Sequence, residues 1–198
     1  MNDVASAAIA AVAGHTAVRG VEPAGSRSRG THDELSDWDF AVETDDFPAV
    51  ARDMPALVAA LDPVAEQWEP LGHFPVYQVM LRGPTKVEYL FLDHSQDAFP
   101  PLVPGPDTLA AIDTHFWDWT WWLATKEHIG RGDLLAEHLP QMHGHLLGPL
   151  GVRDVPESID AAITAFVARR DELERRYRVT VPRALEQEVR GGLERIRR

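Results

Sequence analysis

The sequence of 198 residues contains no cysteine and only two lysines, Lys86 and Lys126. Without cysteine the chain forms no disulfide, no thiolate zinc site and no thiol nucleophile. Positive charge is also scarce, because 31 acidic residues face 19 basic ones, for a formal charge of −12. Binding along duplex nucleic acid needs a cationic face, so this balance argues against that class of function. It leaves nucleotides and cationic small molecules open as ligands.

Long hydrophobic runs are absent as well. A helix that spans a bilayer needs roughly 20 apolar residues, and no stretch of this sequence reaches that length. Residues 1–14 are rich in alanine but lack the basic start of a signal peptide, and Asp3 comes first. We therefore expect a helix at residues 1–14, no membrane segment and a cytoplasmic protein.

Strand-like patterns dominate the first half of the chain. Between residues 16 and 94, β-branched and aromatic residues predict five strands, and one stretch with helical periodicity predicts a helix. The strands are expected at residues 18–21, 38–43, 64–68, 76–81 and 87–92, and the helix at residues 46–61. The turn sequence at residues 82–84 predicts that the last two strands form a hairpin.

Helical patterns dominate the second half, after a proline-rich link at residues 99–106. Helices are expected at residues 107–129, 132–147, 157–177 and 182–197, although Pro140 and Gly144 weaken the second one. Because the strands precede the helices, the fold class is predicted to be α+β. We expect a small mixed β-sheet domain at residues 1–98 and a C-terminal helical bundle at residues 107–198.

The basic residues gather at the C-terminal end. Residues 167–198 contain ten arginines and six acids. The two kinds alternate along the predicted helices, which is typical of a solvated helix surface. We expect such a surface here rather than a face that binds a partner.

The most informative segment is residues 25–40. Gly25 follows a predicted strand and permits a tight turn with close approach of the backbone to a ligand. Ser26 adds a hydroxyl and an amide, which we expect at the start of a helix. Such a turn can hold phosphate oxygens with its N–H groups. Arg27 and Arg29 add positive charge nearby.

Two acids of this segment alternate along the second predicted strand. Asp37 and Asp39 point to one face, whereas Trp38 and Phe40 point to the other and into a core. Two neighbouring carboxylates repel each other unless a cation balances them. Hard divalent cations such as Mg²⁺ take oxygen ligands of this kind and share their remaining positions with water and phosphate.

A third acid lies inside an apolar strand. Glu88 points away from the face shared by Val87, Tyr89 and Phe91. An acid in such a strand is unusual unless it is paired or holds a metal ion. Glu88 therefore either completes a carboxylate cluster, if its strand lies beside that of Asp37, or pairs with a basic neighbour.

These residues resemble a known family. A Gly-Ser pair, ten further residues, an Asp-x-Asp and a later strand acid resemble the DNA polymerase β-type nucleotidyltransferase superfamily. Residues 25–30 and 36–39 are similar to motifs of bacterial aminoglycoside and lincosamide nucleotidyltransferases, and residues 121–126 and 131–133 resemble the helical region of those enzymes. The motif region covers residues 18–93. Glu88 departs from the pattern, since many members have aspartate at that position.

The resemblance implies roles for the site residues. Gly25, Ser26 and Arg29 would bind the nucleoside triphosphate, ATP or another. Asp37, Asp39 and Glu88 would be catalytic and would bind Mg²⁺, two ions being expected. The reaction would move a nucleoside monophosphate, AMP from ATP being the first expectation, to a hydroxyl of a small molecule. Whether Glu88 also acts as a general base stays open.

Lys126 is a further candidate ligand of the nucleotide. It follows Leu109, Ile112, Phe116, Trp119 and Leu123 at alternating steps of three and four residues, so it continues the inward stripe of its helix. A cation in that position needs an anionic partner, and a triphosphate would serve. The alternative is that Lys126 extends to solvent at the helix end.

Two classes of function follow from these patterns. The first is a nucleotidyltransferase whose acceptor is a small hydroxylated molecule; an acidic body would attract a polycation such as an aminoglycoside. The alternative is an antitoxin-like or regulatory protein of the same fold that modifies or binds a protein partner.

Overall fold

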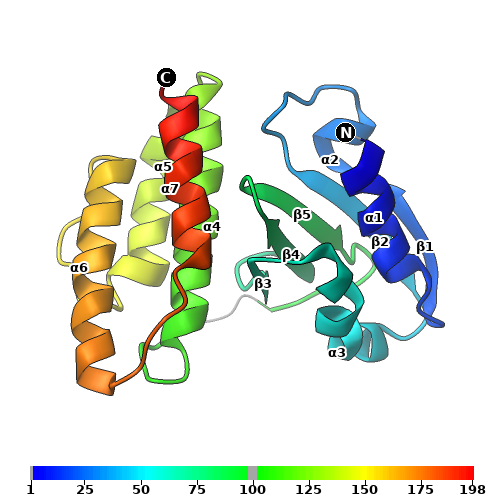
Figure 1. Ribbon diagram of the computed structural model, residues 1–198, viewed down its shortest axis with the longest axis horizontal. Helices are drawn as coiled ribbons and strands as arrows, with labels where there is room; N and C mark the ends of the chain where they lie inside the picture. The colour runs from blue at the N-terminus through cyan, green and yellow to red at the C-terminus, as the bar shows by residue number, and fades with distance from the viewer. Residues whose placement is uncertain (1, 98–101) are drawn as a thin grey trace. The chain divides into compact units, whose positions relative to one another are not determined.

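The computed structural model describes residues 2–97 and 102–198, so residues 99–101 of the predicted link lie outside the described residues. The chain divides into two compact units, Met1–Ala98 and Phe99–Arg198. The first contains a mixed β-sheet with helices, and the described part of the second is helical (Figure 1). The predicted α+β class, with a small mixed sheet before C-terminal helices, is confirmed.

The sheet of the first unit has five strands in the order β1-β2-β5-β4-β3. β2 and β5 are parallel, and the other neighbours are antiparallel. The predicted hairpin is confirmed, since Leu81 pairs with Thr85 across the turn between β4 and β5. The elements are α1 (Asn2–Ala13), β1 (Val18–Pro23), α2 (Gly25–Ser28), β2 (Trp38–Thr44), α3 (Phe47–Val58), η1 (Ala59–Leu61), β3 (Ala65–Trp68), β4 (Val76–Leu81) and β5 (Thr85–Leu90).

One face of this sheet packs on α1 and α3. Their buried residues join alternate strand residues, among them Phe40 and Tyr89, in a single hydrophobic core. The hydroxyl of Tyr89 donates a hydrogen bond of 2.8 Å to the carbonyl of Ala8, which fastens α1 to β5. Asp46 caps α3 by accepting a hydrogen bond from the amide of Ala49. Alternate side chains of each strand therefore point to the opposite face, away from α1 and α3.

The second unit packs its helices around α4 (Leu109–His128). This helix contacts α5 (Asp133–Met142), α6 (Ile159–Tyr177) and α7 (Ala184–Ile196). Phe116 of α4 stacks on Phe166 of α6 with ring centroids 3.8 Å apart. Pro140 does not end α5, and η2 (His143–Leu147), a π-helix, follows α5 directly. Among the described residues, no helix combines the length and apolar character needed to cross a membrane.

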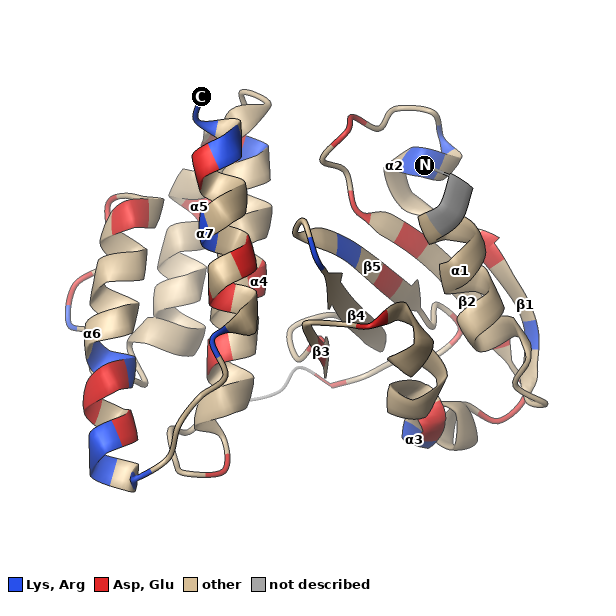
Figure 2. Cartoon of the chain, in the orientation of Figure 1, with Lys and Arg blue, Asp and Glu red and all other residues tan. Residues whose placement is uncertain are grey.

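The arginine-rich end corrects one prediction. Acidic and basic residues do alternate along α6 and α7 (Figure 2), but Arg170 is only 2% exposed. Its Nη1 donates to Asp113 of α4 at 3.0 Å and to Glu186 of α7, so one guanidinium joins three helices. A solvated surface was therefore the wrong expectation for Arg170, because it occupies the inward stripe of α6 together with Ile163, Phe166 and Leu173.

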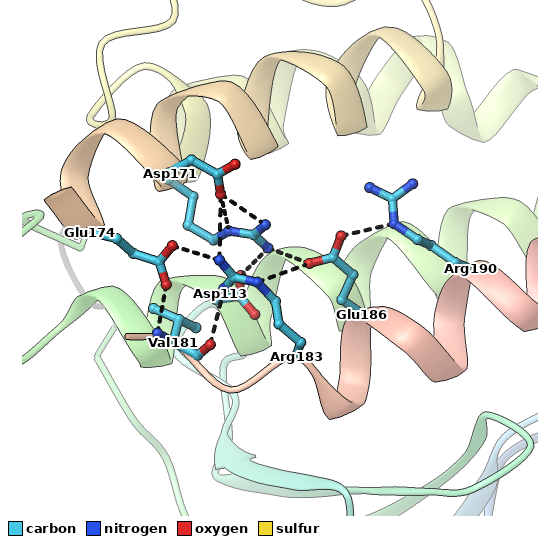
Figure 3. A network of polar contacts seen from close by, with 8 residues as sticks. Asp113, Asp171, Glu174, Val181, Arg183, Glu186 and Arg190 are labelled. Carbon is cyan, nitrogen blue, oxygen red and sulfur yellow. Dashed lines mark hydrogen bonds and ion pairs between the residues drawn. The ribbon is translucent and has the colours of Figure 1, made fainter. Parts of the chain in front are cut away.

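The pKa values of the two acids bound to Arg170 shift in opposite directions. Desolvation raises the pKa of Asp113 to about 6, and its hydrogen bond from Arg170 only partly opposes that effect. Burial also acts to raise the pKa of Glu186, but hydrogen bonds from Arg170 and Arg190 outweigh it and lower that pKa. A second arginine, Arg183, extends the network to Asp171 and Glu174 (Figure 3).

Candidate active site

The turn after β1 packs directly on an aspartate of β2. Gly25 has a φ of +60°, and a Cβ atom built on it would lie 1.7 Å from Oδ2 of Asp39. The neighbouring amide of Ala24 donates a hydrogen bond of 2.8 Å to the carbonyl of Asp39. Glycine is thus required twice at this position, once by the backbone conformation and once by the carboxylate that lies against it.

The short helix α2 forms the rest of the turn. It begins at Gly25, so Ser26 lies at the start of a helix, as the sequence predicts. The hydroxyl of Ser28 donates to the carbonyl of Gly25 at 3.0 Å, and the amide of Thr31 donates to the carbonyl of Ser26. Arg29 follows at the end of α2 with an exposed side chain. These bonds fix the backbone around Gly25 and Ser26.

Arg27 supports the loop that leads to the acids. Its Nε donates to the carbonyl of Asp37 at 3.0 Å and its Nη2 to the carbonyl of Ser36 at 2.7 Å. The guanidinium also lies 3.7 Å from the ring centroid of Trp38. The sequence indicates Arg27 only as positive charge near the turn, whereas these contacts show that it holds the loop before β2 in place.

The structure brings two of the three predicted carboxylates together. Asp39 of β2 is directly opposite Glu88 of β5 in the parallel register, and their side chains are within hydrogen-bond distance. Asp37 lies one residue before β2 and two residues before Asp39. Two carboxyl groups this close need a shared proton or a cation between them.

A row of polar side chains continues from Glu88 across the sheet. The register places Gln67 of β3 opposite Gln78 of β4, and Gln78 opposite Glu88. Gln67 donates to the Oε1 of Gln78 at 3.1 Å, and Gln78 donates to the Oε1 of Glu88 at 3.0 Å. Gln78 also donates to Oε2 of Glu69 at 3.1 Å. This row could not be predicted from the sequence, because the spacing within each strand does not show which strands are neighbours.

Glu88 also has a basic neighbour. Nζ of Lys86, two residues earlier in β5, lies 2.9 Å from Oε1 of Glu88. Burial acts to raise the pKa of Glu88, but attraction and hydrogen bonding by Lys86, with help from Gln78 and Asp39, outweigh burial and lower it. The structure therefore shows that Glu88 pairs with a basic neighbour and lies beside Asp39, and its place in a three-carboxylate cluster stays a prediction.

The residues present suit a hard divalent cation. Asp39 and Glu88 supply carboxylate oxygens at one point of the sheet, and Asp37 adds a third carboxylate close by in the chain. Oxygen donors of this kind favour Mg²⁺ or Mn²⁺ over softer metals. Because Gly25 has no Cβ atom, the turn leaves room for Oδ2 of Asp39.

Lys126 belongs to the second unit. The stripe that precedes it is buried, including Phe116, Trp119 and Leu123, as predicted. Lys126 itself is half-buried near the end of α4, with its Nζ 5.5 Å from the ring centroid of Trp122. Its contact with a nucleotide stays a prediction.

Comparisons with known proteins find a solved structure that aligns with the chain. No family model matches the chain, and the search of curated proteins finds no match. The crystal structure of an aminoglycoside 6-adenyltransferase from Bacillus subtilis aligns with 98% of this chain and 95% of its own, at a TM-score of 0.38 and 11% sequence identity. A likeness of this strength does not assign a function, and the candidate site is defined by the residues around Gly25, Asp39 and Glu88.

Proposed function

We propose that the protein is a metal-dependent nucleotidyltransferase that moves a nucleoside monophosphate from a nucleoside triphosphate to a hydroxyl of a small molecule. One observation supports this most directly: the Gly25 turn lies against Asp39, which is paired in register with Glu88. A backbone turn that can approach phosphate oxygens therefore adjoins carboxylates suited to a divalent cation.

The turn would hold the triphosphate. The backbone amides of Gly25 and Ser26, at the start of α2, would bind phosphate oxygens, and the contact of Gly25 with Oδ2 of Asp39 would place that phosphate beside a metal ligand. The hydrogen bonds at Ser28 and Thr31 keep this backbone in place before the nucleotide binds. Arg29, exposed at the end of α2, would add positive charge toward the phosphates.

The acids would do the metal-dependent part of the work. Mg²⁺ held by Asp37, Asp39 and Glu88 would supply Lewis acidity, which stabilises negative charge on the triphosphate and lowers the pKa of the acceptor hydroxyl. In the transfer, the acceptor oxygen forms a bond to the α-phosphorus while the bond to pyrophosphate breaks. The hydroxyl proton would pass to a general base, and Glu88 is the residue that we propose for this role.

The acceptor is proposed to be a small hydroxylated molecule, and an aminoglycoside-like polycation is the first class to test. The formal charge of −12 would attract such a cation over a distance. ATP is the donor that we would test first, followed by the other nucleoside triphosphates. Lys126 would assist by binding the triphosphate.

A mass-spectrometric screen tests the proposal. The protein is incubated with Mg²⁺, each nucleoside triphosphate in turn and a panel of hydroxylated antibiotics, with the Asp39→Asn variant as the matched control. The expected result is a product that carries one added nucleoside monophosphate and that forms with the natural chain but not with the variant. If only a protein partner gained this mass, the small-molecule acceptor would be wrong and the antitoxin-like alternative would replace it.

A further inference from the structure

The three acids Asp37, Asp39 and Glu88, here called the carboxylate cluster, have a cation of the chain itself beside them. Lys86 is one of two lysines in the sequence, and its ammonium lies 2.9 Å from Oε1 of Glu88. The two residues are two positions apart in β5, so they share the sheet face that also displays Asp39. The fold therefore places a positive charge beside carboxylates that are otherwise suited to divalent metal.

One oxygen of the Glu88 carboxylate is bound by two donors. Oε1 accepts from both Lys86 and Gln78, at 2.9 Å and 3.0 Å. The amide of Gln78 is held in turn by Gln67 and Glu69, which fixes which end of it faces Glu88. Oε1 of Glu88 therefore already accepts from two donors, which reduces its capacity to bind a cation shared with Asp39.

The charge of Lys86 affects how many divalent ions the carboxylate cluster can bind. Lys86 cancels part of the negative charge of these carboxylates, and Arg27, which binds the carbonyl of Asp37, adds a second cation near them. Because the affinity of a site for a hard cation depends on the negative charge of its ligands, both cations weaken the binding of a second divalent ion. A triphosphate would bring the further negative charge that a second ion needs.

We propose that Lys86 is a built-in cation of the carboxylate cluster, which limits the cluster to one weakly held divalent ion until a nucleoside triphosphate binds. The inference rests on the proposed function, since it concerns the same metal site. It makes Lys86 a positioning and charge-balancing residue that acts through Glu88. A purely structural ion pair would stabilise β5 in the same way but would not restrain metal binding.

Titration of the full-length protein with Mn²⁺, without nucleotide, separates these roles. Binding is followed by calorimetry and by the electron paramagnetic resonance signal of unbound Mn²⁺. Lys86→Met and Lys86→Gln should each bind Mn²⁺ about tenfold more tightly than the natural chain, because a repulsive charge a few ångströms away is removed. Lys86→Gln keeps a donor for Glu88, so it guards against a loss of folding in Lys86→Met.

Two variants serve as controls. Lys86→Arg keeps the charge and should bind Mn²⁺ as the natural chain does. Arg52→Met removes one positive charge from α3, which packs on the opposite face of the sheet, and should also leave Mn²⁺ affinity unchanged. Addition of a non-hydrolysable ATP analogue should raise the number of bound Mn²⁺ ions from one to two in the natural chain.

The result that would overturn the inference is unchanged or weaker Mn²⁺ binding by a folded Lys86→Met or Lys86→Gln variant, with folding checked by circular dichroism. Two Mn²⁺ ions bound tightly by the natural chain without nucleotide would overturn it as well. Asp39→Asn distinguishes this failure from that of the proposed function. If Asp39→Asn did not weaken Mn²⁺ binding, the proposed metal site itself would be wrong. If Asp39→Asn weakened Mn²⁺ binding but neither Lys86 variant strengthened it, only the role of Lys86 would be rejected.

Discussion

Asp39 on β2 and Glu88 on β5 are paired in register, with their side chains within hydrogen-bond distance of each other. The parallel pairing of the two strands creates this relationship between residues that are far apart in the sequence. Gly25 is the third partner, because Oδ2 of Asp39 occupies the space that a larger residue would need. These three residues are the basis of the functional proposal.

The turn offers a sharp test through Gly25→Ala. The added methyl group would clash with Asp39, and the φ of +60° would be strained. Loss of stability of about 1–3 kcal/mol is expected from the backbone strain alone. We also expect at least tenfold weaker binding of Mg²⁺ and ATP, measured by calorimetry, because the clash displaces a metal ligand.

Gly30→Ala is the matched control for that variant. Gly30 also has a positive φ, +68°, but nothing lies within 4 Å of the Cβ that alanine would add. It should therefore lose stability to a similar degree and still bind the nucleotide. Equal loss of nucleotide binding in both variants would contradict the contact between the turn and the metal ligands.

The buried network of the second unit predicts a large effect for Arg170→Met. This change leaves Asp113 and Glu186 without their shared cation, and an uncompensated buried charge costs about 3–5 kcal/mol. Arg197→Met breaks an exposed pair with Asp160 instead and should cost about 0–1 kcal/mol. Urea unfolding followed by tryptophan fluorescence measures both, and similar losses would argue against the network as a determinant of stability.

The raised pKa of Asp113 predicts a dependence of stability on pH. Its folded pKa of about 6 lies above the ordinary value for aspartate, so the folded state holds the proton more tightly than the unfolded state. The contribution of this group to the free energy of unfolding should therefore fall as the pH rises from 4 to 7. The stability difference between the natural chain and Asp113→Asn should shift against the natural chain over that range; a constant difference would contradict the assignment.

Lys126 is tested by kinetics once an acceptor is known. Lys126→Ala should raise the apparent KM for the nucleotide, because a positive charge near the triphosphate is lost. Lys126→Arg should restore most of the natural value. Unchanged kinetics in Lys126→Ala would support the alternative in which this lysine extends to solvent at the end of α4.

Much of the fold could be predicted from the sequence because its elements follow local patterns. The alternation around Trp38 and Phe40 and the three-four spacing in α4 each reported a buried face that the structure contains. β5 differs from its prediction, since it begins at Thr85 and continues the hairpin directly from the turn. Apolar periodicity does not report that start, because Thr85 and Lys86 are polar.

The site was less predictable because it depends on strand order. The spacing of Asp37 and Asp39 is visible in the sequence, but the position of Glu88 opposite Asp39 requires β5 to lie beside β2. The contacts of Gln78 with Glu69 and Glu88 depend on the same order. Charge alternation predicted a solvated surface for Arg170, whereas its place between Phe166 and Leu173 on one helical stripe determines that it is buried.

Calorimetric titration of the protein with ATP in the presence of Mg²⁺ tests the central claim most directly. The natural chain should bind the nucleotide only with the metal present, and Asp39→Asn should weaken binding at least tenfold, since a ligand of the metal is lost. Asp62→Asn, an exposed change outside the cluster at the end of η1, should bind as the natural chain does. Metal-dependent binding of equal strength in Asp39→Asn and the natural chain would contradict the account.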